Sequence, residues 1–179
     1  MAGGFVYNNR IYLKTGIRVV FGVIWLIDGT FKFLFNNPQT FTQMIQAGGA
    51  GQPAFFAPWF NFWFVTVSQS SQFWFYLIGV SETLLGLALI FGFMKKLAYS
   101  LGMLLSLLIW SVPEGFGGPY GPSSTDIGTG IMYAVVFVAL ILINAEFGPS
   151  RYALDTWIEK RIKWWHKIAE FGDYKAKAK

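Results

Sequence analysis

The chain has 179 residues, of which 54% are hydrophobic and 13% are charged, and its formal net charge is +5. Soluble domains carry about 25% charged residues, so this composition excludes an ordinary water-soluble globule. The sequence contains no cysteine, which excludes disulfides, thiolate nucleophiles and cysteine-ligated metal or iron–sulfur sites. Any redox chemistry therefore needs a bound organic partner.

Four apolar stretches are each close to the length of a membrane-spanning helix. About 20 apolar residues cross the hydrocarbon of a bilayer, and a helix satisfies its own backbone hydrogen bonds there. The third stretch is short and spans only if Lys95 and Lys96 extend their charged groups to the membrane surface. The sequence predicts an all-α integral membrane protein, with residues 1–146 forming a four-transmembrane-helix bundle whose spans lie at about residues 15–35, 73–93, 97–112 and 127–146.

The first span carries ionisable residues on one face. At 100° per residue, Arg18, Trp25 and Lys32 lie within about 80° of one another, and Asp28 lies at the margin of this face. Charges inside hydrocarbon cost about 2.5–3.5 kcal/mol each, so they are candidate functional groups. Two alternatives stay open for Asp28 and Lys32, which are either part of a site or a self-neutralising i,i+4 pair. Arg18 is either a ligand-binding residue or a structural arginine that reaches the membrane surface.

The loop between the first two spans has no charged residue and many aromatic ones. Tryptophan and phenylalanine collect at the membrane interface, so residues 41–45 and 55–64 are predicted to be short interfacial or re-entrant segments that cover the bundle. Either a hydrophobic quinone enters beneath this cover, or the aromatic side chains contact lipid or a partner protein.

The outer ends of the second and fourth spans add further polar groups. Glu82, Asp28 and Lys32 lie between about 5 and 14 Å below the outer ends of their helices, so the three can share one pocket. The glycine-rich loop at residues 113–126 contains Glu114 and Tyr120 and ends in residue types that cap helices, namely Ser123, Ser124, Thr125 and Asp126. A helix start beneath such a loop can bind a small anion, and the alternative is a tight, well-capped turn.

The distribution of lysine and arginine predicts that both termini are cytoplasmic. The loops at residues 36–72 and 113–126 contain neither residue, whereas the two termini and the connection between the second and third spans carry them. Residues 147–179 are predicted to form a cytoplasmic helix and basic tail, with residues 151–171 an amphipathic helix lying flat on the lipid headgroups. His166 is expected to be a polar flank of this helix and not a haem ligand.

Three sequence motifs, which together lie in three of the four spans, resemble a known family. The first span reads Arg18-x3-Gly22-x2-Trp25-x3-Gly29-x2-Lys32, the second contains Glu82-x3-Gly86, and residues 114–133 read EGFGGPYGPSSTDIGTGIMY. These motifs resemble the DoxX/DoxD membrane family, and within it the DoxD subunits of archaeal thiosulfate:quinone oxidoreductases. The resemblance covers residues 14–145.

The resemblance implies that thiosulfate is oxidised to tetrathionate on the extracytoplasmic side and that a membrane quinone of the caldariella type is reduced, with no metal or haem. It implies a DoxA-type companion subunit, a terminal quinol oxidase as a further partner, and the plasma membrane of a sulfur-oxidising thermoacidophilic archaeon. Placed on this sequence, it assigns catalytic roles to Lys32, Asp28, Glu82 and Glu114, and substrate binding to Arg18, Trp25, Tyr120, Thr125 and Asp126. Lys32 and the start of the fourth span would hold thiosulfate, and the carboxyl groups would supply protons.

Two other functions remain compatible with the sequence. One is a non-catalytic subunit that anchors or assembles a terminal quinol oxidase complex, in which the polar groups only hold helices together. The other is a small anion or proton carrier, which the absence of an inverted repeat disfavours. Lipid and protein partners are expected, and no nucleic acid.

Overall fold

The computed structural model describes residues 3–34, 37–120 and 126–172, and these residues form helices and connecting segments but no strand. The prediction of an all-α protein is therefore confirmed. Four helices are long: α1 (Gly3–Leu34), α4 (Ser71–Phe91), α5 (Lys95–Ser111) and α6 (Thr129–Phe147). The shorter elements are α2 (Pro38–Gly49), η1 (Ala54–Phe56), α3 (Ala57–Ser68), η2 (Gly115–Gly117), α7 (Leu154–Ile158), η3 (Lys163–Trp165) and α8 (His166–Ala169).

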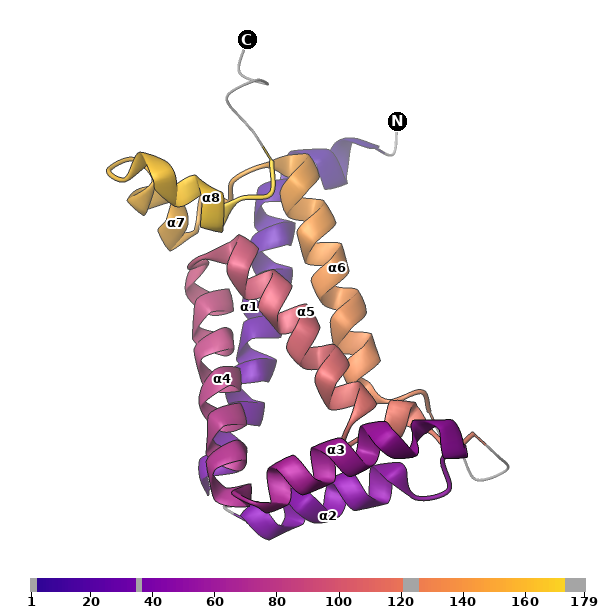
Figure 1. Cartoon of the computed structure of the whole chain (residues 1–179). Coiled ribbons are helices and arrows are strands. Elements are labelled where there is room, and N and C mark those ends of the chain that lie inside the picture. Colours follow the sequence, from indigo (N-terminus) through magenta and orange to yellow (C-terminus); the bar gives the residue numbers. More distant parts are fainter. Residues whose placement is uncertain (1–2, 35–36, 121–125, 173–179) are drawn as a thin grey trace.

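The long helices are arranged as two pairs, α1 with α4 and α5 with α6 (Figure 1). Small residues allow α1 and α4 to approach closely, since a Cβ atom added at Gly86 would lie 2.6 Å from the Leu26 backbone nitrogen. The hydrophobic core lies between the pairs and includes Trp25, Leu89 and Phe137. Two helices, α4 and α6, are long and apolar enough to cross a membrane, by length and composition.

The two ends of the bundle differ. The connection between α4 and α5 and the segment at residues 148–172 lie at one end, which we call the tail end (Figure 1). Helices α2 and α3 lie across the opposite end, close to η2, and we call this the pocket end (Figure 1). The predicted cover segments at residues 41–45 and 55–64 fall within α2 and within η1 and α3. Helix α2 begins at Pro38 because the Asn37 side chain accepts a hydrogen bond from the Thr40 N–H and proline is favoured in the first turn.

The tail does not form the single amphipathic helix predicted for residues 151–171. It consists of three short helical pieces, α7, η3 and α8. The prediction is wrong because Asp155 and Glu170 are buried in the bundle, where each carboxylate lies 2.8 Å from the Lys95 Nζ atom. Lys95 is 1% exposed, so the expectation that it extends to the membrane surface is wrong as well.

The buried carboxylate of Asp155 also stabilises the start of α5. Its oxygens accept hydrogen bonds from the backbone N–H groups of Met94 (2.7 Å) and Lys95 (3.0 Å) and from the Trp165 indole (2.8 Å). The free N–H groups at a helix start favour a negative charge. The tail is therefore joined to the bundle by a buried polar network.

Candidate functional site

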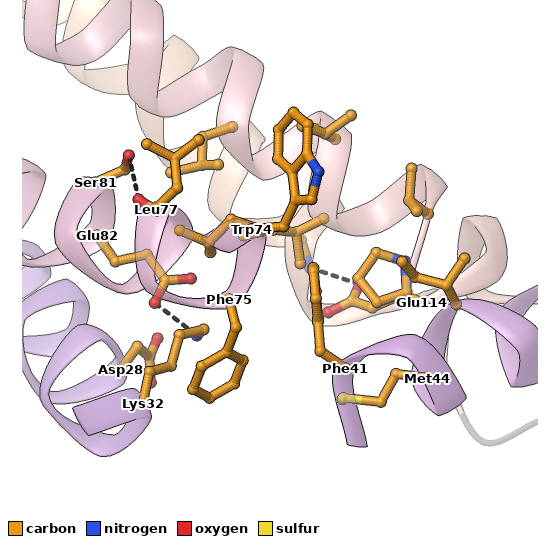
Figure 2. A pocket seen from close by; sticks show the side chains of 18 of the residues that line it. Asp28, Lys32, Phe41, Met44, Trp74, Phe75, Leu77, Ser81, Glu82 and Glu114 are labelled. Carbon is orange, nitrogen blue, oxygen red and sulfur yellow. Dashed lines mark hydrogen bonds and ion pairs between the residues drawn. The ribbon is translucent and has the colours of Figure 1, made fainter. Parts of the chain in front are cut away.

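A pocket of about 750 Å³ lies between the two helix pairs at the pocket end. Side chains from α1, α4, α5 and α6 line it together with side chains from α2 and α3. Figure 2 shows the lining residues that α1, α2 and α4 contribute. The lining is largely apolar and rich in rings, which come from Trp25, Phe31, Phe41, Trp63, Trp74, Phe75 and Tyr133. Such a cavity has the size and apolar character of a small-molecule site.

The structure brings all four predicted catalytic residues to this pocket, where Asp28, Lys32, Glu82 and Glu114 line the wall. The Lys32 Nζ atom lies 2.6 Å from Glu82 Oε2, and this ion pair joins α1 to α4 (Figure 2). The Glu82 side chain is 3% exposed and that of Lys32 is 25% exposed. Lys32 therefore pairs across helices with Glu82 and is not confined to a local pair with Asp28.

Asp28 lies beside this ion pair (Figure 2) and has a further partner that the sequence reasoning missed. The Tyr133 hydroxyl on α6 donates to Asp28 Oδ2 at 3.5 Å. Tyr133 is the last residue of the motif at residues 114–133 and lies about one helical turn into α6. This position could have predicted from the sequence that Tyr133 lies at the depth of the pocket. The pocket thus combines a carboxyl–lysine–carboxyl group with a phenol, all of which can exchange protons with a ligand.

The start of α6 differs from the expected anion site. Glu114 Oε2 accepts a hydrogen bond from the Gly130 N–H (2.8 Å), and Asp126 Oδ1 accepts one from the Gly128 N–H (2.7 Å). Gly128 occupies the N-cap position instead of the predicted cap residues. Two carboxylates of the chain itself already neutralise this helix start, so an incoming anion would have to displace them.

The other predicted substrate-binding residues are not brought together. Trp25 lines the pocket, but Arg18 lies near the middle of α1, about 21 Å from Lys32 at 1.5 Å per residue. The buried Arg18 donates to the Tyr152 carbonyl at 2.8 Å, which joins the tail to α1. Tyr120 is exposed and donates to the Phe116 carbonyl at 2.6 Å, and Thr125 lies outside the described residues.

Comparison with known proteins finds no relative of this chain. Neither protein-family models, nor curated proteins, nor solved structures match the chain.

Proposed function

We propose that α1, α4, α5 and α6 each cross the membrane, with the tail end cytoplasmic and the pocket end outside. Exposed apolar side chains support this arrangement, for example Leu84, Val135 and Leu142, which are each 58–62% exposed on the outer faces of α4 and α6. A core helix of a soluble protein would bury such residues. Basic residues are absent between Lys32 and Glu82 and frequent in the tail, which fits the positive-inside rule.

We further propose that the protein is the quinone-reducing membrane subunit of a thiosulfate:quinone oxidoreductase. The observation that carries the proposal is a pocket with aromatic walls that also contains proton-exchanging groups. A quinone supplies a flat, neutral ring that takes up two electrons and two protons when it is reduced. Phe41, Trp74 and Phe75 supply apolar ring surface, and Asp28, Glu82 and Tyr133 supply exchangeable protons, so the residues present fit this group.

The charge of the pocket favours separate places for the two substrates. Lys32 is the one basic residue among the described lining residues, against three carboxyl groups, which favours a neutral ring in the interior. Thiosulfate, a dianion, binds at the partly exposed ammonium group of Lys32. There it competes with Glu82 for the same charge, and its binding releases Glu82 to hold and deliver a proton.

The overall reaction balances without a metal. Two thiosulfate ions each lose one electron and join through a new sulfur–sulfur bond to form tetrathionate. The two electrons and two protons convert the quinone to the quinol. The identification of thiosulfate as the electron donor rests on the resemblance to the DoxX/DoxD family, whereas the quinone part rests on the pocket.

The experiment that tests the proposal measures quinol formation from thiosulfate and a short-chain quinone in membranes that hold the protein with its native partners. Glu82→Gln keeps the shape of the side chain but cannot exchange a proton, so it is expected to lower the rate at least about tenfold. Glu146→Gln, at an exposed position near the tail end of α6, is the matched control and is expected to keep full activity. Full activity of an assembled Glu82→Gln protein would refute the proton-transfer role. Quinone binding without thiosulfate-dependent reduction would refute thiosulfate as the donor.

A further inference from the structure

Two tryptophans that line the pocket have a buried indole N–H group without an acceptor. Among the residues that the structure describes, Trp25 Nε1 and Trp63 Nε1 make no hydrogen bond. Trp25 is 1% exposed, so bulk water does not reach its indole. A buried donor without an acceptor is destabilising, and buried tryptophans usually find a partner.

Other tryptophans in the same molecule follow this rule. Trp59 donates to the Ser111 carbonyl at 3.1 Å, Trp110 to the Ile127 carbonyl at 2.8 Å, and Trp165 to Asp155 Oδ1 at 2.8 Å. None of these three lines the pocket. The unpaired indole groups are therefore a feature of the pocket walls and not of tryptophan packing throughout this chain.

The surroundings of both rings supply ring surface and no acceptor. Trp25, on α1, contacts the rings of Phe21, Tyr133 and Phe137, with centroids 5.5–6.2 Å apart. Trp63, on α3, packs edge-on against Trp74 at 6.5 Å. The two rings come from different elements, α1 and α3, and both line the pocket, so a molecule bound there can supply an acceptor for their N–H groups.

We propose that Trp25 and Trp63 are the hydrogen-bond donors that hold the carbonyl oxygens of a neutral quinone ring in this pocket. An indole donates and does not accept, so it recognises a carbonyl and carries no charge that would attract an anion. The same two donors stabilise the negative charge that develops on the oxygens as electrons arrive. This inference rests on the proposed quinone site and adds the groups that orient the ring.

The first test is an NMR measurement on the full chain in lipid nanodiscs with ¹⁵N-labelled tryptophan. The chain has eight tryptophans, and ubiquinone-1 is the probe. We expect the indole N–H resonances of two tryptophans to move downfield as hydrogen bonds form, while those of Trp59, Trp110 and Trp165 keep their positions. The wild-type spectra show how many indole groups respond, and Trp63→Phe identifies one of them.

The second test measures the affinity for ubiquinone-1. One hydrogen bond contributes about 0.5–1.5 kcal/mol net, so Trp25→Phe and Trp63→Phe are each expected to raise Kd by about 2- to 10-fold. Trp157→Phe, at an exposed position on α7 outside the pocket lining, is the control and is expected to bind as the wild type does. If Trp25→Phe fails to fold, the wild-type spectra and the affinity of Trp63→Phe still test whether the indole groups donate to the quinone.

The outcomes separate this inference from the proposed function. Tight binding of ubiquinone-1 with unmoved indole resonances, or with Trp63→Phe unchanged in affinity, overturns the donor role and leaves a quinone pocket in place. Absence of any binding overturns both. Two shifted resonances without thiosulfate-dependent turnover support the donors and contradict only the choice of electron donor.

Discussion

The ion pair between Lys32 and Glu82 allows a double-mutant cycle whose outcome follows from burial. We expect Lys32→Met to destabilise the protein far more than Glu82→Gln does. Lys32→Met leaves a carboxylate that is 3% exposed without its cation, whereas Glu82→Gln leaves an ammonium group on a side chain that is 25% exposed and lies beside Asp28. The double variant is expected to recover most of the stability, because Glu82 is then no longer a buried carboxylate without its cation.

The expected loss of stability in each single variant follows from the burial of the charge that the substitution leaves behind. Removing one partner of a buried ion pair costs about 3–5 kcal/mol, so Lys32→Met is expected to lower the free energy of unfolding by about 3 kcal/mol. Glu82→Gln keeps an oxygen that can accept from Lys32 and is expected to cost about 1 kcal/mol. A double variant that loses only about 1 kcal/mol then gives a coupling energy of about 3 kcal/mol, at the upper end of the range measured for residues in contact.

Equilibrium unfolding of the four proteins, followed by tryptophan fluorescence at pH 7 in one detergent, measures the cycle. Quinone reduction measured on the same samples separates stability from function, since the double variant is expected to be stable and inactive. Additive losses of stability in the double variant would refute the reasoning, because the two side chains would then act independently. Restored turnover in the double variant would show that the pair serves only assembly.

The remaining predictions concern helix packing, the tail and the orientation in the membrane. Gly86→Ala would place a methyl group 2.6 Å from the Leu26 nitrogen and is expected to lower the free energy of unfolding by about 1–3 kcal/mol in an unfolding titration. In the control Gly16→Ala the added methyl group meets nothing within 4 Å, so this variant is expected to be neutral or stabilising. Equal effects of the two variants would contradict the close approach of α1 and α4. Burial and the nearby Glu170 raise the pKa of Glu159, whose Oε1 is buried without a hydrogen-bond partner among the described residues. The folded protein thus binds this proton more tightly than the unfolded chain, and the stabilisation is lost as the pH rises through the folded-state pKa. Glu159→Gln is therefore expected to raise Tm by about 2 °C at pH 7 and to have no such effect near pH 4, and a gain of equal size at both pH values would argue against it. A cysteine at Gln39 is expected to react with an impermeant thiol reagent from outside and one at Lys160 only from the cytoplasm; the opposite labelling would invert the topology.

Sequence reasoning predicted the helices α4, α5 and α6 well because their positions depend on local composition, whereas α1 begins at Gly3 and not near residue 15. Each of α4, α5 and α6 is a run of apolar residues, so its ends lie within about two residues of the predicted ones. The common depth of Asp28, Lys32 and Glu82 follows from the fixed rise per residue of a helix, which is why the sequence placed them in one pocket.

Contacts between distant segments could be decided only by the tertiary structure. The choice of Glu82 as the partner of Lys32 depends on how α4 is rotated about α1, which Gly22 and Gly86 set by close approach. The tail was misread because its apolar spacing favours a surface helix, whereas Asp155 and Glu170 bind Lys95 in the interior. A buried ion pair forms between residues that are about 60 to 75 positions apart in this chain, and local periodicity carries no information about such a partner.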